Sequence, residues 1–311
     1  MASVSVAQVP QQGAAAKAIL YAFLANAGIA LAKTWAAIYT GSSSMTAEAI
    51  HSFADASNQV LLFHGLKQSQ RPADTEHPLG YGKLSYFWSF IVALMLFSLG
   101  GLFSIYEGIH KLQETEPVRQ VWVGLIVLAV AVVLEFLSLM GALREIRHLR
   151  RNKPLARWLQ TTRNAELVVV LGEDTAALIG LTLAFIFLGT AAITGNPAYD
   201  AAGSIAIGIV LIIVSAFIAA RIKGLLIGRS AEPELQAKID AIIADDPAID
   251  MVFNTITIQM GPKIMLAAKI LLPAGMPTSE AVTHINALER RLKAEVPQIG
   301  WCFIEPDITD A

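Results

Sequence analysis

The sequence predicts a polytopic α-helical membrane protein, in which six transmembrane helices are followed by a small α+β domain. Three observations lead to this fold class. Only 15% of the 311 residues are charged and 55% are hydrophobic, whereas a soluble domain averages about 25% charged residues. Apolar runs long enough to cross a bilayer, about 20 residues each, recur along the chain. The composition then changes after Lys223, where shorter and more polar segments begin.

Six runs qualify as membrane spans. The second run is the most polar, but the short linker "TGSSS" before it favours a hairpin of two spans over a helix that lies on the membrane surface. The expected spans are roughly Lys17 to Tyr39, Met45 to Leu66, Leu84 to His110, Val118 to Leu143, Asn164 to Leu188, and Tyr199 to Leu226.

Basic residues alternate between the loops and predict the orientation. The segment 144–163 carries seven Lys and Arg residues against the single acid Glu145, and the turn after the second span holds Lys67, Arg71 and Lys83. The loops between them have little or no net positive charge. Because cytoplasmic loops are enriched in Lys and Arg, both ends of the chain are expected in the cytoplasm.

The chain is expected to divide into three parts: a flexible tail over 1–16, the six-helix transmembrane domain over 17–227, and a cytosolic domain over 228–311. In the last part an amphipathic helix opens near Pro233, the runs "MVFNTITIQMG" and "KIMLAAKILLPAG" suit strands, a second helix begins at Thr278 or Ser279, and "IGWCFIEPD" suits a last strand. This α-β-β-α-β order indicates a small ferredoxin-like domain. Its size favours dimerisation.

Several function classes are excluded or disfavoured. A net charge of −2 gives no indication of nucleic-acid binding, and the single Cys302 cannot form an intramolecular disulfide. The chain has no H-E-x-x-H motif, and His51, Asp55 and Asp174 lack an evident general base, which argues against an intramembrane enzyme such as a metalloprotease. The first residues resemble neither a signal peptide nor a transit peptide, which favours a bacterial inner membrane.

Two spans carry acidic and imidazole side chains at the same expected depth. His51 and Asp55 are four residues apart, so they share one face of the second span. Asp55 lies ten residues into that span and Asp174 ten residues into the fifth, which places both about 15 Å deep at 1.5 Å per residue. This is near the centre of a hydrocarbon core about 30 Å thick.

A carboxylate at the bilayer centre costs roughly 2.5–3.5 kcal/mol or more, so such residues usually face a partner or a wet cavity. A structural hydrogen bond between the two spans would need a protonated or cationic partner, because Asp55 and Asp174 repel each other. A bound cation satisfies both carboxylates and the histidine together. This ligand set suits Zn²⁺, and less selectively Mn²⁺, Fe²⁺, Co²⁺ or Cd²⁺.

The chain resembles the cation diffusion facilitator family of divalent-metal/proton antiporters. The matching stretches are "GSSSMTAEAIHSFADASNQ", "RPADTEHPLGYGKLSYFWSFI", "GEDTAALIG" and the closing "FIEPD". The residues of the first and third stretches look most similar to the branch that includes mitochondrial zinc-transporter-like members. The resemblance covers nearly the whole chain. It implies a homodimer with one metal site per protomer, between the second and fifth spans.

Carried over by position, the family's site gives His51, Asp55 and Asp174. The fourth ligand normally stands four residues before the fifth-span aspartate, where this chain has Val170. Glu173 is next to Asp174, but one residue is about 100° of helix rotation, which turns Glu173 away unless the helix is distorted. Either a water or Glu173 is expected to complete the metal's ligands.

Two secondary metal sites of the family are only partly matched. In the loop after the second span, Asp74 and His77 match the family's pattern, but Tyr81 stands where a histidine is expected. Metal binding and a turn-stabilising role are equally compatible with this pair. In the cytosolic domain His284 and Glu305 match ligand positions. These two residues alone predict a degraded site, and Cys302 is expected in the core.

Other polar residues in the spans invite structural roles. Lys33 in the first span is expected to reach the membrane surface or to pair with Glu48 across the hairpin. Asn58 lies one turn below Asp55 and is expected to hydrogen-bond it as a supporting group. Glu107 and Glu135 are also polar at depth and have no assigned role.

The predicted function is export of divalent transition metals from the cytoplasm in exchange for protons, by alternating access to the midplane site. Zinc is the expected main substrate. Metal ligands must be deprotonated, so binding a cation expels protons. The expected partners are a second copy of the chain, divalent cations, protons and membrane lipids. The alternative is a transporter-derived scaffold or regulator, favoured by Val170 and by the thinned cytosolic ligands.

Overall fold

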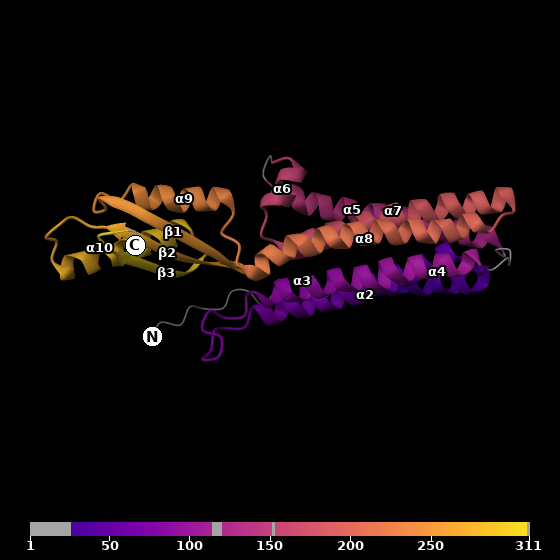
Figure 1. Cartoon of the computed structure of the whole chain (residues 1–311), viewed down its shortest axis with the longest axis horizontal. Helices are drawn as coiled ribbons and strands as arrows, with labels where there is room; N and C mark the ends of the chain where they lie inside the picture. Colours follow the sequence, from indigo (N-terminus) through magenta and orange to yellow (C-terminus); the bar gives the residue numbers. More distant parts are fainter. Residues whose placement is uncertain (1–25, 114–119, 151–152, 310–311) are drawn as a thin grey trace. The chain divides into compact units, whose positions relative to one another are not determined.

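The computed structural model describes residues 26–113, 120–150 and 153–309 (Figure 1). Two compact units divide the chain. The first comprises Met1–Phe63, Ile91–Leu149 and Val169–Ala219, and the second comprises His64–Phe90, Arg150–Val168 and Ala220–Ala311. The candidate site belongs to the first unit.

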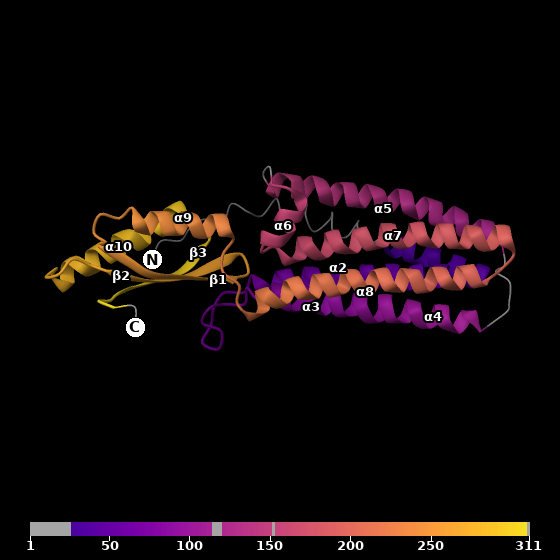
Figure 2. The ribbon, with the colours of Figure 1, turned by 45° about the horizontal axis from the view of Figure 1, so that its top comes forward.

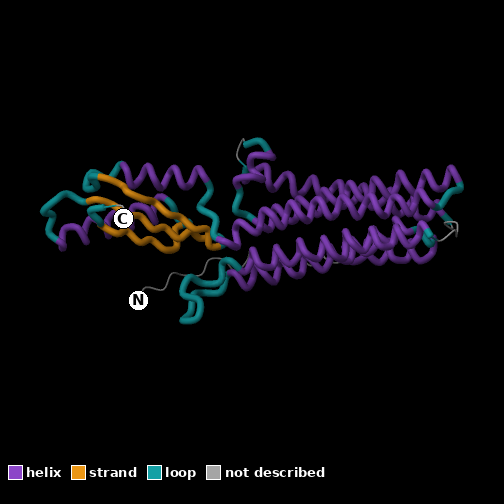
Figure 3. The backbone as a smooth tube through the Cα atoms, viewed as in Figure 1, coloured by secondary structure: helices purple, strands orange, loops and turns teal. Residues whose placement is uncertain are grey.

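Long helices follow the predicted spans wherever the structure describes them. The first helix is described over 26–40, and the start of its predicted run, 17–25, lies outside the described residues. Two features were not predicted. One is a π-helical segment inside the third run. The other is the short helix α6 after the fourth run, which is labelled in Figure 2 and drawn as a helix in Figure 3. The elements are α2 Ser43–Ser69, α3 Leu84–Met95, η1 Leu96–Leu102, α4 Phe103–Leu112, α5 Val121–Leu149, α6 Leu155–Thr161, α7 Ala165–Thr194 and α8 Ala198–Ile227.

Four of the described helical stretches are long and apolar enough to cross a membrane: Leu84–Leu112, Val121–Arg144, Ala165–Thr194 and Ala198–Ile227. Large apolar side chains on them point outward, among them Trp122 at 77% exposed and Ile193 at 89% exposed. Such exposure suits contact with lipid rather than water. α2 has 27 residues, enough to span, but its polar residues lower its hydropathy.

A backbone contact holds η1 against α8. A Cβ atom added to Gly208 would lie 2.6 Å from the carbonyl oxygen of Gly101, and one added to Gly101 would lie 2.6 Å from a side-chain carbon of Ile212. Two turns further along, in α4, a Cβ on Gly108 would lie 2.7 Å from the carbonyl oxygen of Ala201. Small residues of this kind let membrane helices approach closely and pack by van der Waals contact.

The C-terminal residues form the predicted order of elements, α-β-β-α-β. α9 Pro233–Ala244 and α10 Thr278–Glu295 pack on a three-stranded sheet of β1 Met251–Met260, β2 Lys263–Leu271 and β3 Ile299–Pro306 (Figure 1). β2 lies in the middle, antiparallel to β1 and parallel to β3. Isoleucines of α9, leucines of α10 and alternate residues of β2 share one core, which includes the buried Cys302 as predicted.

Asp200, in the first turn of α8, fixes the beginning of α2. Its carboxylate accepts hydrogen bonds from the backbone N–H of Ser43 at 2.6 Å, from the Ser42 hydroxyl at 2.8 Å, and from the hydroxyls of Ser43 and Ser44. The side chain is 2% exposed. The carboxylate therefore satisfies donors at the N-terminus of α2, where an anion is also favoured by the helix dipole.

Lys33 joins the first helix to α2 as predicted. Its ammonium donates to Glu48 Oε2 at 3.0 Å and to Ser52 Oγ at 2.7 Å, and both charged residues are buried. The pairing replaces the water that either charge would otherwise need. Gly180 of α7 leaves the space for Glu48, because a Cβ there would lie 2.6 Å from Glu48 Oε1.

We expect Asp200→Ala to destabilise the protein in detergent by about 2–5 kcal/mol, since it leaves several buried donors unsatisfied. Thermal unfolding followed by circular dichroism measures the change. The matched control is Asp250→Ala, because Asp250 is an exposed aspartate of the second unit, and its loss should change stability by no more than about 0.5 kcal/mol. Equal melting of the two variants would contradict the role given to Asp200.

Removing one partner of the Lys33–Glu48 pair leaves the other charge buried without its partner. We therefore expect Lys33→Met to cost about 3–5 kcal/mol. The double variant Lys33→Met/Glu48→Met should recover most of that loss, because an apolar pair of similar volume is near neutral in stability. The same melting assay applies. A double variant as unstable as the single one would show that the two side chains are not coupled.

Candidate metal site

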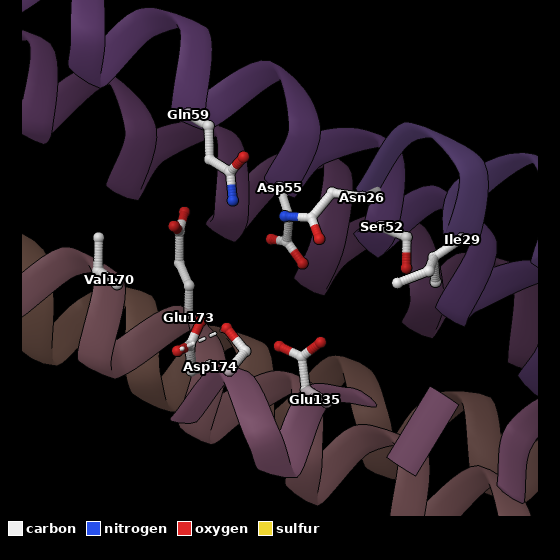
Figure 4. A pocket seen from close by; sticks show the side chains of 10 residues that line it. Asn26, Ile29, Ser52, Asp55, Gln59, Glu135, Val170, Glu173 and Asp174 are labelled. Carbon is white, nitrogen blue, oxygen red and sulfur yellow. Dashed lines mark hydrogen bonds between the residues drawn. The ribbon is translucent and has the colours of Figure 1, made fainter. Parts of the chain in front are cut away.

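A pocket between the helices of the first unit contains four carboxylates. They come from three helices: Asp55 of α2, Glu135 of α5, and Glu173 and Asp174 of α7 (Figure 4). Figure 4 shows side chains from both sides directed into the space between the helices. The remaining lining residues are Asn26, Ile29, Ser52, Gln59, Ser138 and Val170.

His51 and Asp55 lie together on α2, as their spacing predicts. His51 Nε2 is 3.4 Å from Asp55 Oδ2. His51 is 0% exposed and does not line the pocket. Within the part of the chain that the structure describes, neither ring nitrogen of His51 has a hydrogen-bond partner, and nor does Asp55 Oδ1. Buried polar atoms are usually hydrogen-bonded, so these three atoms are candidates to contact a bound ligand.

Glu173 lies on the pocket side of α7, which corrects the expectation that it turns away. α7 is a regular α-helix through this region, yet both Glu173 and Asp174 line the pocket. Two adjacent residues can both line the pocket because they lie on either side of the helix face that α7 turns toward its neighbours. The longer side chain of Glu173 reaches across to α2. There Glu173 Oε1 accepts a 2.6 Å hydrogen bond from Asn58 Nδ2.

Asn58 therefore supports a different carboxylate from the one expected. The described hydrogen bond of its amide goes to Glu173 of α7, not to Asp55 one turn away on the same helix. Asn58 is 0% exposed. A buried amide that reaches the neighbouring helix fixes the orientation of Glu173 within the pocket.

Asp174 and Val170 both line the pocket, one turn apart on α7. Ser138 of α5 donates a 3.3 Å hydrogen bond to Asp174 Oδ2 (Figure 4). Val170 offers the pocket only methyl groups, as the sequence predicts. Among the described residues, no three His, Cys, Asp or Glu side chains lie close enough together to hold a metal ion. The carboxylates share one pocket but do not converge on one point in this structure.

Sequence reasoning missed the roles of Glu135 and Ser138, both on α5. Their spacing of three residues places them on one face of that helix, which is the signal that was available. Which face of α5 meets α7 depends on packing, and spacing alone does not reveal it.

Asp74 and His77 build a turn in the loop before α3. Asp74 Oδ1 accepts from the backbone N–H groups of Glu76 at 3.1 Å and His77 at 2.7 Å, and Asp74 Oδ2 accepts from the Tyr81 hydroxyl at 2.7 Å. The Tyr81 hydroxyl, followed by the His77 N–H, holds the pKa of Asp74 below its usual value. Both carboxylate oxygens thus have partners without a metal.

His284 and Glu305 lie in different places within the C-terminal domain. His284 of α10 lines a hollow beside Ile285 and Leu288, and its Nε2 is 3.8 Å from Glu280 Oε1. Glu305 of β3 lines a separate hollow with Asn254, Lys269 and Phe303. The structure of the single chain does not bring these two residues together.

Comparison with known proteins identifies the helical part of the chain. Residues 19–222 match the model of the cation efflux transmembrane domain. The whole pocket lies between these limits, from Asn26 to Asp174.

Several characterised proteins resemble the chain over most of its length. It is 35% identical over 257 residues to the mitochondrial proton-coupled zinc antiporter SLC30A9 of Xenopus laevis, covering 82% of this chain and 46% of that protein. It is 32% identical over 218 residues to metal tolerance protein C4 of Arabidopsis thaliana, covering 70% and 48%.

A third relative, magnetosome protein MamB of a Magnetospira strain, is 24% identical over 286 residues and is covered to 91%. The chain spans about half the length of the first two relatives. The family model matches more than half of this chain, and two relatives above 30% identity cover 70% or more of it. The chain therefore belongs to the cation efflux family of membrane transporters.

Proposed function

We propose that this protein exports divalent transition-metal cations across a membrane in exchange for protons, with Zn²⁺ as the favoured substrate. The observation that carries the proposal is the pocket of the first unit, where Asp55 of α2 faces Glu173 and Asp174 of α7. Like charges in an apolar setting repel one another, and a divalent cation relieves that repulsion while it gains ligands.

His51 supports the same reading. It is fully buried beside Asp55, and both of its ring nitrogens lack partners among the described residues. A ring rotation would let this imidazole join the carboxylates around an ion. Nitrogen and oxygen donors together suit Zn²⁺, with Mn²⁺, Fe²⁺, Co²⁺ and Cd²⁺ as further substrates. The names of two relatives describe zinc antiport and metal tolerance.

Glu173 is proposed as the ligand that the sequence alone left open. It lines the pocket, and the Asn58 amide holds one of its oxygens. His51, Asp55, Glu173 and Asp174 then form the primary site, with Asn58 as its supporting group. This arrangement weakens the alternative of a scaffold without transport, because that alternative rested mainly on the missing ligand at Val170.

Proton exchange follows from the chemistry of the ligands. A carboxylate or imidazole that holds a metal cannot also hold a proton, so loading and protonation exclude each other. If the pocket opens alternately to the two sides of the membrane, a cation leaves one side as protons enter from the other. We infer that the protein works by this alternating access.

The architecture proposed for this function has six spans. α2 and the helix described over 26–40 would join the four apolar stretches as the remaining two spans, with both ends of the chain facing the cytoplasm. The C-terminal domain is proposed to be ferredoxin-like and to join two copies into a homodimer. The membrane that holds the protein stays a prediction. One relative is named as mitochondrial, one comes from a plant, and MamB comes from a bacterium.

The secondary sites are proposed to be structural in this chain. Both carboxylate oxygens of Asp74 accept hydrogen bonds from residues of its own loop. His284 and Glu305 line separate hollows of one domain.

We expect Asp174→Asn to reduce Zn²⁺ uptake into proteoliposomes by about tenfold or more, because it removes a charged ligand without changing side-chain size. Zinc and pH indicators inside the vesicles record both fluxes, and the proton flux should fall in parallel.

The matched control is Glu107→Gln, which neutralises a carboxylate of α4 that does not line the pocket. It should transport at the wild-type rate. Wild-type Zn²⁺ and proton fluxes in the Asp174→Asn vesicles would disprove the site. Zinc flux without any proton flux in the wild type would disprove antiport but leave the site intact.

A further inference from the structure

Glu135 has no role in the site that the sequence predicts, yet it is the one acidic residue of the apolar stretch Val121–Arg144. A carboxylate in such a stretch is expensive to keep, and residues of this kind usually mark an ion pathway or a charge partner. α5 faces the bundle at this point, because Glu135 and Ser138 both line the pocket.

The surroundings of Glu135 offer it no cationic partner. No hydrogen bond or ion pair of Glu135 occurs among the described residues, and the nearby Lys33 is bonded to Glu48 and Ser52. Figure 4 shows the Glu135 carboxylate directed into the same space as those of Asp55 and Asp174. What this side chain lacks is a positive charge within the pocket.

α7, by contrast, has a pocket-lining position without a metal donor. Val170 lines the pocket at the position where a ligand was expected, and it contributes only methyl groups. The position of Val170 on α7 therefore contributes no donor, and a carboxylate without an assigned role enters the same pocket from α5.

We propose that Glu135 binds the transported metal directly, from α5, as a donor in addition to Glu173 of α7. This inference rests on the proposed function and extends it to a third helix. The pocket then presents carboxylate oxygens from α2, α5 and α7, with His51 beside it rather than in its lining. The two glutamates carry the longer side chains, so they close on an ion that the two aspartates first attract.

A consequence for selectivity follows. Carboxylate oxygens suit harder cations such as Mn²⁺, whereas imidazole favours Zn²⁺. A fourth carboxylate in place of a histidine should therefore let the site hold Mn²⁺ well beside Zn²⁺. Glu135 is the residue on which Mn²⁺ binding should depend most.

The test measures binding of Zn²⁺ and of Mn²⁺ to the purified full chain by isothermal titration calorimetry. Glu135→Gln should weaken binding of both metals by about tenfold or more, and Mn²⁺ the more strongly. The matched control Glu107→Gln should bind like the wild type. Adding Val170→His to Glu135→Gln should restore Zn²⁺ binding but not Mn²⁺ binding, because it returns a nitrogen donor to the vacant position.

Size-exclusion chromatography and thermal melting show whether each variant keeps its fold. Glu135→Asp retains the charge and shortens the reach, so it replaces the glutamine variant if that one fails to fold. Weakened metal binding at an unchanged melting temperature supports the inference.

Wild-type affinity in both Glu135 variants, alongside lost binding in Asp174→Asn, overturns the inference and leaves the proposed function standing. A wild-type protein that binds neither metal overturns both.

Discussion

Negative charge inside an apolar helical bundle is the constraint on which the rest of this structure depends. The pocket holds four carboxylates, and Glu48 lies buried one turn from His51. Each needs a counter-charge or a donor, because the hydrocarbon interior supplies neither. Glu48 has Lys33, Glu173 has the Asn58 amide and Asp174 has the Ser138 hydroxyl. Asp55 and Glu135, the carboxylates without such a partner among the described residues, line the same pocket, where the proposed cation would bind.

Structural charges hold the helix that carries half of the site. Asp200 satisfies the donors at the start of α2, and Lys33 holds the turn that contains Glu48 and Ser52. Both interactions lie on the N-terminal side of Asp55, and the second includes Ser52 of the pocket lining, so they help to fix the rotation of α2 at the site. A metal site needs this support, because ligands held loosely lose affinity and selectivity.

The spacing of residues along the chain predicted the contacts that depend only on local helix geometry. His51 and Asp55 share a face because they are four residues apart, and Lys33 reaches Glu48 because a short hairpin joins their helices. The same reasoning failed for Glu173 and Asn58, whose partners depend on how α2 and α7 pack. Glu135 was noticed but given no role, since the face of α5 that meets the pocket is a tertiary property. The π-helical turn of η1 likewise left no periodic signal in an apolar run.

The glycine contacts between η1 and α8 bear on how the bundle can move. Where Gly101 meets Gly208, backbone touches backbone, with no side chain between to change its rotamer. Such a contact can be kept or lost but cannot be adjusted by degrees, since close-packed interfaces resist continuous deformation. These contacts therefore favour joint movement of η1 and α8. Under the proposed alternating access, the pocket would open to either side through changes in the contacts of α2, α5 and α7, which supply its carboxylates.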